Sequence, residues 1–217
     1  MGPGLALEGA RARHVPRLES WRASMDPLAA LRRQLLAAGP APARTASSSN
    51  SGVEDYTGRV VVVTGAGGGI GSRIAFQFAC AGATLALCDV RREELDAAET
   101  ACRAAGCDKL FASVVDVADA AAVEEFCRST AEALGGGIDC LINTVGIVDC
   151  FGDAEELPLD EWERVMRVNV TSALLTAKYS VPLMRERGGG AIINISSASG
   201  LANQVRKPVF LRHFIPK

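Results

Sequence analysis

The feature that most constrains the fold of this chain is a glycine-rich segment directly after a run of valines. Val60–Val63 is apolar and β-branched, as is typical of a strand buried on both faces of a sheet. The next residues, Thr64-Gly-Ala-Gly-Gly-Gly-Ile-Gly71, predict a tight turn that opens a helix to about Ala81. A strand, a glycine turn and a helix in this order predict the first half of a parallel βαβ unit.

The same alternation of apolar runs and helical segments continues to about residue 195. We expect further strands at Thr84–Cys88, Leu110–Val115, Ile138–Ile142 and Ala191–Ile195. Further helices are expected at Arg91–Ala105, Asp119–Leu134 and Glu161–Arg187. Strands that alternate with helices of this length predict right-handed crossovers, and therefore an α/β fold with a doubly wound parallel sheet.

The two ends of the chain differ in composition from this central part. Residues 1–55 are rich in Arg, Ala and Ser, and we expect a flexible extension with one short helix around Pro27–Ala37. An organelle-targeting segment and translation that begins at Met25 are the alternatives. Residues 204–217 form a basic tail without a helical stripe, so the α/β domain is expected to span residues 56–203.

Composition narrows the classes of function. The formal net charge of −2 gives no reason to expect nucleic acid as a partner. No apolar run reaches the roughly 20 residues of a membrane-spanning helix. The seven cysteines contain no Cys-x-x-Cys pair and the two histidines lie near opposite ends, so neither a disulfide framework nor a metal site is expected. Reduced thiols indicate a cytoplasmic protein, and the arginine-rich start makes a mitochondrial or other organelle location the alternative.

The glycine-rich segment is also the first candidate binding site. Its spacing is Gly65-x-x-x-Gly69-x-Gly71, with Thr64 before it and Ile70 between the last two glycines. Glycines let the backbone approach a pyrophosphate closely, and the following helix offers unpaired N–H groups and the positive end of its dipole. Between a strand and a helix, this pattern predicts dinucleotide binding.

Asp89, at the end of the second expected strand, bears on which dinucleotide is bound. A carboxylate at this place accepts hydrogen bonds from both hydroxyls of an adenosine ribose and repels a 2′-phosphate. Arg91 and Arg92 follow at once and would attract that phosphate. On the electrostatic argument we expect NAD as the cofactor and keep NADP as the alternative.

Motifs at the ends of later strands make the chain similar to the classical short-chain dehydrogenase/reductase family. Thr64–Gly71 matches the family's Thr-Gly-x-x-x-Gly-x-Gly turn, and Asp116 with Val117 matches the Asp-Val pair whose aspartate holds the adenine. Asn143-Thr-Val-Gly146 resembles the family's Asn-Asn-Ala-Gly, with Thr and Val in place of the second Asn and the Ala. The resemblance covers about residues 57–203 and implies a Rossmann-like fold.

The same resemblance implies two catalytic residues. Asn169, within Val168-Asn-Val170, matches an Asn that positions a proton-relay water, and the alternative is a buried Asn with a structural partner. Ser197 aligns with the serine that hydrogen-bonds the substrate carbonyl or hydroxyl. Asp160, with Glu163 three positions later, is expected to cap the helix that carries Asn169.

The resemblance also predicts a gap in the catalytic set. In the family, a proton-transferring Tyr follows the serine by about a dozen residues, with a Lys four positions later. The only tyrosines here are Tyr56 and Tyr179, and Val60 and Leu183 lie four residues after them. We therefore expect a chain truncated before Tyr-x-x-x-Lys, which leaves the family pattern near Gln204. About five of the family's seven strands are then present, with the fifth at a sheet edge.

Functions of different classes follow from these patterns. The first is an NAD(P)-dependent oxidoreductase that transfers hydride between an alcohol and a ketone. The resemblance implies a small-molecule substrate and an assembly of like chains, although the family's usual interface helix is missing from this sequence. The alternatives are a cofactor-binding or interaction protein without catalysis, and a truncated product that is unstable. Stabilisation by NAD together with turnover distinguishes the first from the others.

Overall fold

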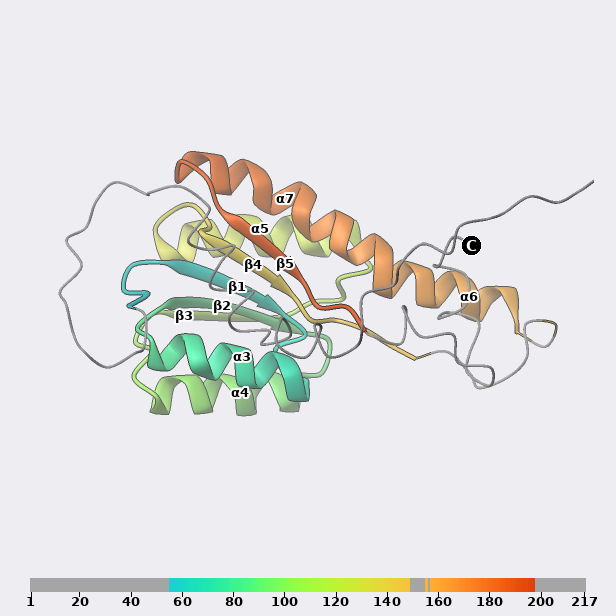
Figure 1. Ribbon diagram of the computed structural model, residues 1–217, viewed down its shortest axis with the longest axis horizontal. Helices are drawn as coiled ribbons and strands as arrows, with labels where there is room; N and C mark the ends of the chain where they lie inside the picture. The colour runs from blue at the N-terminus through green and yellow to red at the C-terminus, as the bar shows by residue number, and fades with distance from the viewer. Residues whose placement is uncertain (1–54, 149–154, 156, 198–217) are drawn as a thin grey trace, which may run out of the picture.

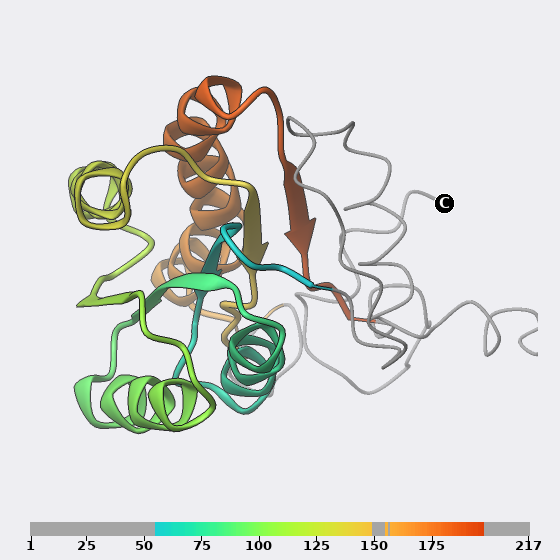
Figure 2. The same cartoon turned by 90° about the vertical axis from the view of Figure 1, so that its left-hand side faces the viewer.

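The computed structural model describes residues 55–148, 155 and 157–197. They form a parallel sheet with helices on both faces (Figure 1), and Figure 2 shows the two helical layers on either side of the strands. The expected extension through residue 54, its helix at Pro27–Ala37 and the basic tail at 204–217 lie outside the described residues.

The sheet has the order β3-β2-β1-β4-β5, and all neighbouring strands are parallel. The strands are β1 Val60–Thr64, β2 Thr84–Asp89, β3 Leu110–Val114, β4 Cys140–Asn143 and β5 Ala191–Asn194. The chain reverses its direction of travel across the sheet between β1 and β4, and open α/β folds bind ligands beyond the carboxyl ends of the strands at such a reversal. The predicted α/β sheet is confirmed, and among the described strands β5 pairs only with β4.

The helices cover the two faces in pairs (Figure 1). The pair α3 Gly69–Cys80 and α4 Arg92–Ala104 packs on one face, and α5 Ala120–Leu134 with α7 Ser172–Glu186 packs on the other. A π-helical segment, η1 Arg167–Thr171, joins α7 to α6 Leu159–Met166, which continues beyond the sheet. The single α-helix expected at Glu161–Arg187 is therefore interrupted by a π-turn.

The expected cap at Asp160 is wrong, because α6 begins at Leu159, two residues before the expected start at Glu161. Pro158 is the N-cap residue, with an extended backbone and no side-chain cap. The extended backbone of Pro158 places it outside the helix, and its missing N–H costs nothing there because the first N–H groups of a helix have no intrahelical acceptor. Asp160 and Glu161 lie in the first turn, where their charges face the positive end of the helix dipole.

The strand sequences read as continuous apolar runs because both faces of the sheet are covered. Val61 and Val63 pack in the cluster under α3 and α4, whereas Val62 and Leu141 pack in the cluster under α5 and α7. All four valines of β1 are 3% exposed or less. Burial on both faces of a central strand removes the polar alternation of a half-exposed strand.

Burial also keeps most of the described thiols protonated. Desolvation raises the pKa of Cys102 from its ordinary value of 9.0 to about 11, and that of Cys140 to about 12. The pKa values of Cys88, Cys107 and Cys127 are raised by the same cause. The unfolded chain therefore releases thiol protons near pH 9, whereas the folded chain holds them to higher pH.

We expect stability to be lost at alkaline pH for this reason. The contribution of the raised thiol pKa values is complete below about pH 9 and disappears as pH rises through about 11 to 12, since the unfolded state then binds fewer protons. Urea denaturation across this pH range measures the loss of stability.

At neutral pH, iodoacetamide should label the exposed Cys80 first among the described cysteines. Rapid labelling of Cys102 in the native protein would contradict this account.

Candidate dinucleotide-binding site

The glycine turn lies at the carboxyl end of β1, at the reversal of strand order. Gly65 has a φ of +66°, in the left-handed region that favours glycine. Gly68 N–H donates to the Gly65 carbonyl oxygen at 3.0 Å, which closes the turn. A Cβ at Gly71 would lie 2.1 Å from that same oxygen, so the chain crosses itself too closely for any side chain. Gly65 and Gly71 therefore set the shape of the turn.

On its other side, where α3 begins, the turn is open to solvent. Gly69, the first residue of α3, is exposed, and a Cβ placed there would meet nothing within 4 Å. The next residue, Ile70, is 59% exposed. The N-cap residue Gly68 has no side chain, so no side-chain cap covers the start of the helix. Accessible N–H groups at the positive end of a helix dipole fit a phosphate group.

Asp89 fastens the turn to the end of β2. It is 6% exposed, and its Oδ2 accepts a hydrogen bond from Gly67 N–H at 2.9 Å. Its Oδ1 accepts from Arg91 N–H at 3.0 Å, with the Arg91 Nε 3.5 Å away. The carboxylate therefore lies at the predicted place, but it has a structural role that the sequence reasoning missed. Gly67 is packed against Glu94, where a Cβ would come within 2.7 Å of the Glu94 side chain.

Asp116 and Val117 follow β3 at the same edge of the sheet. Val115 N–H donates to the Asp89 carbonyl oxygen at 3.0 Å, which keeps the loop beside β2. Asp116 is exposed, and its Oδ1 accepts from Ala118 N–H at 2.9 Å. Val117 is buried at 5% exposure. Val117 therefore anchors the loop in the core, and Asp116 beside it lies exposed to solvent.

Asn143 connects four elements at the carboxyl end of β4. Its Oδ1 accepts hydrogen bonds from Thr64 Oγ1 at 3.2 Å and from Thr176 Oγ1 at 3.0 Å. Its Nδ2 donates to Asn194 Oδ1 at 2.9 Å. The contacts with Thr176 and Asn194 were not predicted from the sequence. The available signals were that Asn194 ends its strand as Asn143 does, and that Thr176 lies two helical turns after Asn169.

Asn169 lies in the π-helical segment and holds the loop that follows β4. Its Oδ1 accepts from Ile147 N–H at 2.8 Å, and its Nδ2 donates to the Ile147 carbonyl oxygen at 2.8 Å. Gly146 beside it is exposed. The partner expected for this amide is therefore a backbone segment. π-Helical turns occur frequently at functional sites, and this one aims Asn169 at the edge where the turn lies.

Ser197 is placed at the same edge, although farther along the sheet. It comes three residues after the end of β5 and is exposed. The structure therefore joins the glycine turn, Asp89 and Asn143 into one hydrogen-bonded assembly. Asn169 is linked to this assembly through the loop after β4, and Ser197 follows the neighbouring strand β5.

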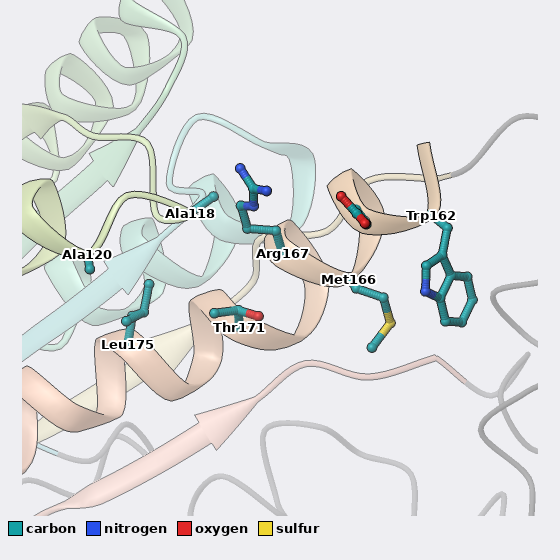
Figure 3. Close-up of a pocket in the computed structure, with 8 residues that line it drawn as sticks. Ala118, Ala120, Trp162, Met166, Arg167, Thr171 and Leu175 are labelled. Carbon is teal, nitrogen blue, oxygen red and sulfur yellow. The ribbon is translucent and has the colours of Figure 1, made fainter. Parts of the chain in front are cut away.

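A separate depression of about 630 Å³ lies against α6 and η1 (Figure 3). The residues that line it include Trp162, Met166, Arg167 and Leu175 from the helices, together with Ala118. None of the predicted site residues lines this depression. Within residues 55–148 and 157–197, no three His, Cys, Asp or Glu side chains gather in a metal-binding arrangement. No helix in the described part of the chain is long and apolar enough to span a membrane.

A parallel sheet of this order, with an open glycine turn at its reversal, defines a dinucleotide-binding α/β protein. The family can be named from the sequence match. A sequence model described as short chain dehydrogenase matches residues 59–210, so the chain belongs to the short-chain dehydrogenase/reductase family.

Individual relatives agree with this assignment. An uncharacterised oxidoreductase of Thermotoga maritima is 36% identical over 156 residues, which cover 72% of this chain and 60% of that protein. Levodione reductase of Leifsonia aquatica is 33% identical over 156 residues, 71% of this chain and 58% of that protein. The crystal structure of NAD⁺-bound xylitol dehydrogenase has a TM-score of 0.67 at 33% identity, covering 71% of this chain and 58% of its own. The chain thus spans about 60% of the length of these relatives.

Proposed function

We propose that this chain is an NAD-dependent oxidoreductase that transfers hydride between the alcohol and ketone forms of a small molecule. The observation that carries the proposal is the glycine turn, which is shaped by Gly65 and Gly71 and open at Gly69. NAD, when bound, supplies the hydride acceptor for alcohol oxidation, and NADH supplies the donor for the reverse reaction. Membership in the short-chain dehydrogenase/reductase family supports the reaction class.

The charges around Asp89 support NAD rather than NADP. Its carboxylate is buried beside the turn, where it would repel a 2′-phosphate. The two nearby arginines are already engaged with acidic side chains. Arg91 pairs with Glu94 at 2.9 Å, and Arg92 pairs with Asp96 at 3.2 Å. Each guanidinium is thus balanced by a carboxylate, so the two arginines add little net positive charge beside Asp89.

The candidate catalytic residues have distinct proposed roles. Ser197, exposed beyond β5, would donate a hydrogen bond to the substrate oxygen. Asn169 would act by holding the loop at Ile147, and so order the water of a proton relay. Asn143, Gly146, Asp116 and Val117 would border the cofactor. We propose an alcohol or ketone as substrate and a cytoplasmic location, which the free thiols of the described cysteines support.

A second candidate function is NAD binding without catalysis, and the tyrosines favour it. Tyr56 lies before the start of β1 and packs edge-on against Phe78, with ring centroids 5.0 Å apart. Tyr179 lies in α7 with the Lys178 Nζ 4.9 Å from its ring. Neither tyrosine has a lysine four residues later. Among the described residues, no tyrosine is followed by a lysine at this spacing, whereas the glycine turn for the cofactor is present, so this part of the chain favours binding.

Thermal unfolding with excess cofactor tests the binding step. We expect a cooperative transition that NAD shifts upward, by about 2.7 kcal/mol of stabilisation at a hundredfold excess over Kd. NADP at the same concentration should give a smaller shift, because it adds a phosphate next to Asp89. No shift with either cofactor would contradict the proposal.

Turnover then separates the two candidate functions. NADH formation, followed by its absorbance, is measured with a panel of secondary alcohols, and its consumption with the matching ketones. Hydride transfer that is weakened by Ser197→Ala supports the oxidoreductase. Clear stabilisation by NAD with no turnover on any member of the panel would favour binding alone.

A further inference from the structure

The side chain of Thr144 lies under the glycine turn, between the two glycines that shape it. Its Oγ1 donates to the Thr64 carbonyl oxygen at 2.7 Å and lies 3.3 Å from the Gly65 carbonyl oxygen. A Cβ at Gly65 would come within 2.9 Å of this Oγ1, and a Cβ at Gly71 within 2.8 Å. The hydroxyl therefore occupies the space that both glycines leave by having no side chain.

We propose that Thr144 is a positioning residue for the dinucleotide site. Its hydroxyl keeps the carbonyl groups of Thr64 and Gly65 turned toward β4, which leaves the opposite, open side of the turn free for the cofactor. The inference rests on the proposed function, since it concerns the same site. Thr144 also stands where the family pattern has its second Asn, so this hydroxyl is a feature of the chain's own sequence.

The hydroxyl is the short link between β4 and the turn. Thr144 N–H lies 3.4 Å from the Thr64 carbonyl oxygen, which is long for a hydrogen bond. Without the hydroxyl, Gly65 would be held less firmly at its φ of +66°. If the turn then adopts its binding conformation about a tenth of the time, the apparent Kd for NAD rises about tenfold.

Two substitutions separate the hydroxyl from the rest of the side chain. Thr144→Val keeps the shape and removes the donor, whereas Thr144→Ser keeps the donor and removes the methyl group. Thr130→Val is the matched control, because Thr130 is 0% exposed and its Oγ1 has no hydrogen-bond partner in the described part of the chain. The Kd for NAD is measured on the full chain by titration calorimetry, well below the melting temperature of each variant.

We expect Thr144→Val to raise the Kd for NAD about fivefold to tenfold. Thr144→Ser should stay within about twofold of the parent chain, and Thr130→Val should leave the Kd unchanged. If Thr144→Val does not unfold cooperatively, Thr144→Ala serves in its place with the same expected weakening. If the side chain of Thr144 acted only by filling space, serine, which lacks the methyl group, would not restore the affinity for NAD.

Two results would overturn the inference while leaving the proposed function intact. One is an unchanged Kd for NAD in Thr144→Val. The other is equal weakening in Thr144→Ser and Thr144→Val, which would assign the effect to the methyl group. Failure of the parent chain itself to bind NAD is a different result, and it would contradict the proposed function together with this inference.

Discussion

Replacing Gly71 with alanine is expected to abolish NAD binding and to destabilise the fold. The new Cβ would lie 2.1 Å from the Gly65 carbonyl oxygen and 2.8 Å from the Gly65 carbonyl carbon, so the backbone of the turn must move. Overpacking of this kind costs about 1–3 kcal/mol, and contact with backbone atoms places the loss at the upper end. Urea denaturation measures the stability of the variant, and calorimetric titration measures its affinity for NAD.

Gly69→Ala is the matched control, two residues away in the same turn. Its Cβ would meet nothing within 4 Å, so the stability of the fold should be kept. Its affinity for NAD should nevertheless fall, because the added methyl group enters the open side of the turn. If Gly69→Ala binds NAD as the parent does, the cofactor does not use that side. If Gly71→Ala keeps full stability, the close crossing described for the turn is wrong.

Replacing Asp139 with alanine is expected to cost about 3 kcal/mol of stability, the lower end of the range for breaking a buried ion pair. Asp139 precedes β4 and is 6% exposed. Its Oδ2 accepts from Val60 N–H at 2.8 Å and from Arg187 Nη2 at 2.7 Å, and its Oδ1 accepts from Arg59 Nη1 at 3.1 Å. Alanine would leave these donors without their acceptor. The lower end applies because Arg59 is 43% exposed and water can replace part of its interaction.

Urea denaturation of Asp139→Ala is compared with that of Asp96→Ala. Asp96 pairs with Arg92 on the surface of α4, where both side chains are more than half exposed, so its loss should change stability little. Arg187→Met removes one of the donors to Asp139 and should therefore cause part of the loss of stability seen in Asp139→Ala. It also removes the hydrogen bond from Arg187 to the Gly58 carbonyl oxygen at 2.8 Å. Equal stability of the Asp139→Ala and Asp96→Ala variants would contradict the importance of the buried carboxylate.

The strands could be predicted closely because central parallel strands are buried on both faces. Val60–Val63 and Thr84–Cys88 were each extended by one residue in the structure, to Thr64 and Asp89. The added residues are polar and end their strands, so an apolar run does not include them. The same reasoning began β4 two residues early, because Ile138 is fully buried without belonging to the strand.

The polar contacts of the site could not be predicted in the same way. The sequence indicated Asn169 as an amide that needs a partner, but its partner Ile147 offers only backbone groups, and backbone groups carry no sequence signal. The π-turn around Asn169 was also missed, since residues 167–171 fit the helical period as well as their neighbours do. Thr144 appeared only as a departure from a family motif, and its contact with Thr64 depends on how β4 packs beside β1.

The position of β1 between β2 and β4 has a consequence for the order of folding. Its pairing with β2 joins segments close in sequence, as Val60 lies beside Thr84. Its pairing with β4 must close a much longer loop, and the hydroxyl of Thr144 reaches Thr64 across 80 residues. Loop closure is slower for such distant contacts. A growing chain would therefore form β1, β2 and β3 early, and the glycine turn would gain its support from β4 only as one of the last events of folding.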